Sequence, residues 1–125
     1  MRDRHTIEDL ASNIQAAKSD IFSGAALSAA KLAILDVIGC AVAGAHEPAP
    51  AAFARWALTT LPSGPCSVWF SGASSHLLGA VTSNAAASSA MDGDDTHWPS
   101  WMHSGSAIVP TALAAAEMYG SSGRE

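Results

Sequence analysis

Positive charge is scarce in this sequence of 125 residues. Six lysines and arginines stand against eleven aspartates and glutamates, which gives a net charge of −5 at pH 7 with the histidines neutral. A protein that binds nucleic-acid phosphates needs clustered lysine and arginine side chains. The composition therefore argues against a nucleic-acid partner.

Long apolar runs and paired cysteines are missing as well. The uncharged stretch 37–46 is much shorter than the roughly 20 residues that cross a bilayer, and the N-terminal MRDRHTIEDL lacks the apolar core of a signal peptide. Cys40 and Cys66 form no C-x-x-C pair, so we expect reduced thiols. These absences predict a cytoplasmic protein without a membrane partner.

Aromatic residues are also few, with one tyrosine and three phenylalanines, whereas alanine dominates and 49% of the residues are apolar. Small apolar side chains favour closely packed helices over sheets. A chain of this length forms at most one domain. We therefore predict an all-α fold, a helical bundle in one domain over residues 1–125.

Helices are expected where apolar residues recur at helical spacing between glycine and proline breakers. The expected helices cover residues 6–19, 24–44, 48–61, 76–91 and 107–119, with an extended segment at 66–70 and a turn at 71–75. Gly120 should follow the end of the last helix. The side chains of the expected helix 76–91 are so small that they bury enough surface only if neighbouring helices pack tightly against them. This predicts a central position for the helix.

The second expected helix has one apolar face and two glycines. The apolar face comprises Leu27, Ile34, Leu35, Ile38 and Val42. Gly39 and Gly44 are positions where another helix can approach closely.

A polar loop between the last two expected helices holds three of the eleven acidic residues and two of the five histidines. Its chemically active side chains are Asp92, Asp94, Asp95, Thr96, His97 and His103. Such a loop on a helical scaffold is a usual place for a functional site, and these groups can exchange protons with a substrate. The aspartates equally suit a purely structural role in turns.

Two stretches together resemble one family. AKLAILDVIGCAVAG, from Ala30 to Gly44, and NAAASSAMDGDDTHWPSWMHSGSAIVPTALAAAE, from Asn84 to Glu117, are similar to the N-terminal part of the MmgE/PrpD proteins. The resemblance implies a helical domain that a smaller mixed domain follows in full-length members, with the active site between them in a homodimer. It further implies lyase chemistry on di- and tricarboxylic acids, by proton abstraction and loss of water or carbon dioxide, without a metal or redox cofactor.

The resemblance also implies roles for residues of the loop. Asp92, Thr96 and His103 match active-site positions of the family. His103 would transfer the proton, and the other two would place the substrate or orient the catalytic group. Asp95 and His97, neighbours in the same motif, are candidate substrate-binding residues whose separate roles stay open.

The sequence departs from the family at three positions. Members usually carry an aromatic residue at Gly93, a proline at Ser104 and often a histidine at Ser89. Glycine and serine at the first two positions should leave the loop less preorganised. The family's chains are several times longer, and their lysines, a further histidine and a tyrosine complete the site. The resemblance thus implies an incomplete site in this chain.

Two other functions remain open. A noncatalytic helical module could retain the family's dimerisation surface and associate with a longer paralogue. Alternatively, a divalent metal could be bound in a hydrolase, because carboxylate and imidazole ligands suit zinc, manganese or magnesium. The residues for this metal site would be Asp92, Asp94, Asp95, His97 and His103, although they match no known ligand spacing.

Overall fold

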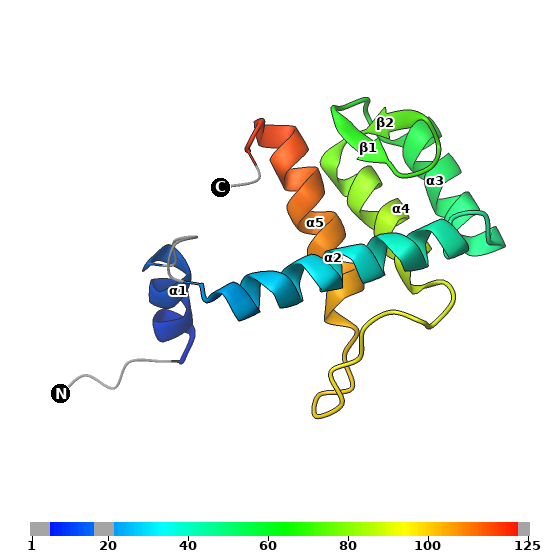
Figure 1. Ribbon diagram of the computed structural model, residues 1–125. Coiled ribbons are helices and arrows are strands. Elements are labelled where there is room, and N and C mark those ends of the chain that lie inside the picture. The colour runs from blue at the N-terminus through cyan, green and yellow to red at the C-terminus, as the bar shows by residue number, and fades with distance from the viewer. Residues whose placement is uncertain (1–5, 17–21, 123–125) are drawn as a thin grey trace.

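A computed structural model describes residues 6–16 and 22–122. This part of the chain forms five helices and one hairpin (Figure 1). The elements are α1 (Thr6–Ala16), α2 (Gly24–Gly44), α3 (Pro48–Thr60), β1 (Cys66–Val68), β2 (Ala73–Ser75), α4 (Leu77–Ser89) and α5 (Ser104–Tyr119). The predominance of helix confirms the predicted fold class. Residues 17–19, the expected end of the first helix, lie outside the described residues.

Helix α4 is central, as its small side chains predicted. It packs against α2, α3 and α5 and also contacts the hairpin (Figure 1). Its buried residues include Gly79, Ala80 and Ala87. Because these side chains are so small, the neighbouring helices can approach its backbone closely.

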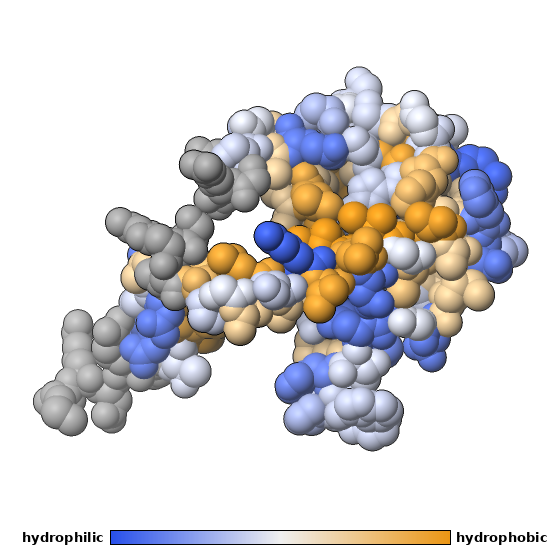
Figure 2. Space-filling view, in the orientation of Figure 1, coloured by the Kyte–Doolittle hydropathy of each residue, from blue (hydrophilic) through white to orange (hydrophobic). Residues whose placement is uncertain are grey.

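Helix α2 buries a different face from the predicted one. Its buried residues are Val37, Ala41 and Gly44, whereas Leu35 is 66% and Val42 is 56% exposed. The periodicity correctly predicted the helix, but its larger apolar side chains are mostly exposed, and the buried positions include the small residues Ala41 and Gly44. The larger apolar residues gather on the outer surface along α2 (Figure 2).

Helix α2 is also longer than the uncharged stretch on which the membrane prediction was based. It is the one described helix whose length and composition would allow it to cross a bilayer. Its most apolar segment of 18 residues has a mean hydropathy of 1.9, and 11% of that segment is buried. The core helix of a soluble protein and a signal sequence near the N-terminus both pass this test of length and composition, and α2, which is near the N-terminus, contacts α4 and α5.

The segment 71–75, predicted as a turn, contains a second strand. Strands β1 and β2 pair antiparallel, with Cys66 opposite Ser75. Phe70 and Gly72 adopt positive φ angles of 60° and 71° and reverse the chain between them. The prediction was wrong for residues 73–75 because a strand is stabilised by its hydrogen-bonded partner rather than by its own pattern.

The hairpin is attached to two helices through side chains. Asn84 of α4 accepts a hydrogen bond from Trp69 N at 2.9 Å and donates one to Ser67 O at 2.9 Å. Glu117 of α5 accepts hydrogen bonds from the backbone N and the hydroxyl of Ser67, at 2.8 and 2.6 Å. The hairpin and both helices therefore form one packed unit.

Helix α5 starts at Ser104, three residues earlier than predicted. Pro110 consequently lies inside the helix, where it was expected in or just after the first turn, and it cannot donate a backbone hydrogen bond. Gly120 ends the helix in the left-handed conformation, with φ of 65°, which confirms its predicted place. The earlier start brings His103 directly to the N-terminal end of α5.

Candidate active site

The acidic loop connects the C-terminal end of α4 with the N-terminal end of α5. The backbone N–H of Asp92 donates to Ser89 O at 3.2 Å, which closes the turn after α4. Asp92 itself has a φ of 51°, a left-handed conformation that aspartate tolerates better than most residues. This turn leaves the carboxylate of Asp92 91% exposed to solvent.

Asp95 holds the other end of the loop. Its Oδ1 accepts a hydrogen bond from Gly105 N at 2.8 Å, and the Ser104 hydroxyl lies 3.5 Å from its Oδ2. A carboxylate in this position satisfies a free N–H group of α5 and interacts favourably with the helix dipole. Asp95, a candidate substrate-binding residue, thus acts as a cap for α5 in this structure.

Gly105 allows this capping contact. A Cβ atom at residue 105 would collide with Asp95 Oδ1 and would lie 2.8 Å from Val37 Cγ2 of α2. The absence of a side chain therefore lets the loop, α2 and α5 meet at one point. That contact fixes the backbone on both sides of the loop.

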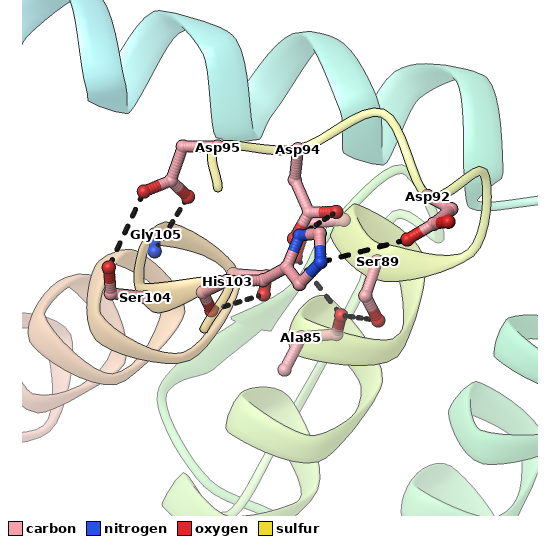
Figure 3. Close-up of polar contacts among 10 residues, drawn as sticks. Ala85, Ser89, Asp92, Asp94, Asp95, His103, Ser104 and Gly105 are labelled. Atoms are coloured by element: carbon pink, nitrogen blue, oxygen red, sulfur yellow. Dashed lines mark hydrogen bonds and ion pairs between the residues drawn. The ribbon is translucent and has the colours of Figure 1, made fainter. Parts of the chain in front are cut away.

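His103 lies between two carboxylates (Figure 3). Its Nε2 is 3.8 Å from Asp92 Oδ1, and its Nδ1 is 3.3 Å from Asp94 Oδ1. The imidazole side chain is 36% exposed, so it is both held by the protein and accessible to a small molecule. An imidazole in this setting can act as a general acid or base.

Asp94 received no catalytic or substrate-binding role from the resemblance, and the sequence offered it only as one of the polar groups of the loop and as a ligand of the alternative metal site. Its side chain is 1% exposed, in contrast to the open carboxylate of Asp92. Position in the acidic run was its only signal in the sequence, where it is indistinguishable from its neighbours. Only the folded structure shows that the carboxylate of Asp94 lies beside His103.

His97 is not part of this cluster. It pairs with Met102 in an isolated β-bridge, and its Nδ1 is 2.7 Å from the Ser100 hydroxyl. Within the turn that this bridge closes, the rings of Trp98 and Trp101 meet edge to face at a centroid distance of 5.6 Å, and both are largely exposed. His97 therefore belongs to the exposed tip of the loop, while Thr96 is half-buried at its base.

Only part of the alternative metal site forms. Asp92, Asp94 and His103 place one ligand atom each within 4.8 Å of one another. Within the described part of the chain, Asp95 and His97 do not join this group. Three such ligands suit a zinc or manganese ion by type, but the set is smaller than the one that the sequence suggested.

Cys40 of α2 also faces the acidic loop. Partial burial raises the pKa of its thiol, and the negative charges of Asp36, Asp94 and Asp95 raise this pKa further. A raised pKa leaves a smaller fraction of reactive thiolate at any given pH. Cys40 should therefore be poorly reactive at neutral pH.

We expect iodoacetamide to alkylate Cys40 more slowly in the native protein than in the denatured protein at pH 8, with the native rate still rising at higher pH. Peptide mass spectrometry after timed quenching gives the rate for each cysteine. Cys66 is fully buried, so it serves as an internal control that should react more slowly still. Equal native and denatured rates for Cys40 would contradict the raised pKa.

Most of the chain, including the acidic loop, is similar to one family of known proteins. The MmgE/PrpD N-terminal domain matches residues 8–125 of the chain. Two sequences named cis-aconitate decarboxylase, both from Aspergillus terreus, are each 34% identical to it over 98 residues. The match covers 78% of this chain and 20% of each relative, so the chain spans about a fifth of the length of those relatives. No solved structure matches the chain.

Proposed function

The chain belongs to the MmgE/PrpD family, and we propose on that basis that it supplies the acid–base part of a lyase site for di- and tricarboxylic acids. The observation that carries the proposal is the position of His103, with one nitrogen beside the exposed Asp92 and the other beside the buried Asp94. The printed name of the Aspergillus terreus relatives, cis-aconitate decarboxylase, supports this substrate class.

His103 suits either reaction of such a lyase. In a dehydration, the imidazole takes a proton from the carbon next to a carboxylate, the C–H electrons form the double bond, and the resulting imidazolium gives its proton to the departing hydroxyl group, which leaves as water. In a decarboxylation, the C–C bond breaks, carbon dioxide leaves, and its bond electrons stay on the substrate carbon, which takes a proton from an imidazolium that water then reprotonates. Asp92 and Thr96 place the substrate in this proposal, and Asp95 fixes the start of α5.

The site still needs positive charge. A tricarboxylate carries about three negative charges at neutral pH, and unscreened carboxylates nearby repel it. Among the described residues only Lys31 and Arg55 carry fixed positive charge, and both are exposed on α2 and α3, outside the loop. We propose that the anion-binding groups come from another part of a longer chain or from a partner subunit, as in a homodimer.

The experiment is a chimera in which this chain replaces the corresponding segment of Aspergillus terreus cis-aconitate decarboxylase. We expect the chimera to convert cis-aconitate or 2-methylcitrate, and the 125-residue chain alone to give little or no product, as chromatography of the acids would show. The unmodified relative is the positive control. A folded chimera without turnover of either acid would refute the proposal, and activity that disappears on chelation would favour the metal site.

A second function is favoured by the exposed apolar surface of α2. Leu32 and Leu35 of this helix are each 66% exposed. A noncatalytic module that binds a longer paralogue would use such a surface. A stable complex with a full-length relative, together with an inactive chimera, would support this second function.

A further inference from the structure

Asp94 is an unusual residue for an exposed loop. Its side chain is 1% exposed, and its Oδ2 has no hydrogen-bond partner among the described residues. A buried carboxylate without a donor or a cation is costly. Of the described side chains, only His103 makes an ion-pair contact with it.

The two nitrogens of His103 face different surroundings (Figure 3). Nδ1 is directed to Asp94 at 3.3 Å and is itself buried without a hydrogen-bond partner among the described residues. Nε2 is directed to Asp92, whose carboxylate is 91% exposed. The Nδ1 edge of the ring is therefore closed by the protein, and the Nε2 edge is open to a substrate.

The backbone holds Asp94 and His103 near each other. The adjacent residue, Asp95, accepts a hydrogen bond from Gly105 N at 2.8 Å, two residues after His103. The buried Asp94 carboxylate and the imidazole thus belong to two segments that are tied together beside the contact. A small rotation of the ring would align Nδ1–H with the carboxylate, since catalytic hydrogen bonds often tighten only when substrate binds.

We propose that Asp94 is a positioning residue that accepts a hydrogen bond from Nδ1–H of His103 and so makes Nε2 the nitrogen that exchanges protons with the substrate. The partner of one imidazole nitrogen sets which nitrogen carries the proton. The substrate part of this inference rests on the proposed function, whereas the position of the proton in the free protein does not.

A metal ion explains the same residues less well. One cation binds a single nitrogen of an imidazole, whereas His103 presents a different nitrogen to each carboxylate. A histidine that donates Nδ1–H to Asp94 keeps Nε2 free to accept a proton, and the imidazolium that then forms can contact both carboxylates. The structure therefore favours the positioning role over a metal centre at this cluster.

The position of the proton can be measured directly. In the ¹⁵N-labelled chain, at a pH where His103 is neutral, the nitrogen chemical shifts should show the Nδ1–H tautomer. His103→Ala identifies its signals. In Asp94→Ala the ratio of Nδ1–H to Nε2–H should fall about tenfold or more, because a hydrogen bond to a charged acceptor is lost. A wild-type protein with mainly Nε2–H, or an unchanged ratio in Asp94→Ala, would overturn the inference.

Asp92→Ala is the matched control, since it removes the carboxylate on the other edge of the ring. It should keep the Nδ1–H tautomer, and a loss of this tautomer in Asp92→Ala would refute the role of Asp94. If Asp94→Ala does not fold, the tautomer of the wild-type protein alone tests the inference: mainly Nδ1–H supports it and mainly Nε2–H overturns it.

Turnover gives an independent readout in the active chimera. Asp94→Ala should lower kcat by about tenfold or more while KM changes less than about twofold, because positioning of the base affects the chemical step more than binding. An unchanged kcat would overturn the positioning role in catalysis. An inactive parent chimera together with the expected tautomer would refute the proposed function and leave the contact between Asp94 and His103 supported.

Discussion

His103→Ala should lower the turnover of the acid substrate by about 10²- to 10⁴-fold, the usual contribution of a positioned general acid or base. Alanine removes both nitrogens, so neither carboxylate of the cluster retains a partner that can carry a proton. The effect should appear mainly in kcat, measured as initial rates in the chimera with the relative's downstream region. It is the largest loss of activity that we expect from a single substitution.

The start of α5 should survive this substitution. His103 is the N-cap residue of α5 but makes no capping hydrogen bond with its side chain, and its backbone O, which accepts from Ser106 Oγ at 3.1 Å, remains. His46→Ala, in the turn between α2 and α3, is the control and should leave turnover unchanged. A His103→Ala chimera as active as the parent would show that another group transfers the proton.

Gly44→Ala should reduce the free energy of unfolding by about 1–3 kcal/mol, the usual cost of overpacking. The added Cβ would collide with the backbone O of Ala87 in α4 and would lie 2.8 Å from Ala90 Cβ. A backbone atom inside a helix cannot rotate away as a long side chain can, so the two helices would have to separate. Urea denaturation followed by circular dichroism measures the change.

Gly39→Ala is the matched control on the same helix. A Cβ at residue 39 has nothing within 4 Å, and alanine is favoured over glycine in a helix by roughly 0.5–1 kcal/mol. Gly39→Ala should therefore leave stability unchanged or increase it slightly. Equal losses for both variants would mean that α2 does not approach α4 closely at Gly44.

The helices could be predicted well because the signals for them are local. Apolar spacing predicted α2, and glycine and proline breakers predicted the gaps around α3 and the end of α5 at Gly120. Strand β2 was missed because its stability depends on pairing with β1 rather than on its own three residues. The start of α5 was placed late because its cap, Asp95, lies nine residues before Ser104, which a search for local caps does not reach.

The candidate loop was also visible in the sequence, since polar residues crowd there and the resemblance carries Asp92, Thr96 and His103. The distinct positions of its three aspartates were not visible. They are the same residue type within four positions, yet Asp92 is exposed, Asp94 is buried beside His103, and Asp95 caps α5.

By itself, the sequence determined where helices form, where the polar loop lies and to which family the chain is similar, because these follow from residues close together in the chain. Only the tertiary structure decided which face of α2 is buried, that Gly44 and not Gly39 lies against another helix, and that Asp94 contacts His103. The reason is physical: burial and charge pairing depend on atoms that folding brings from distant parts of the chain.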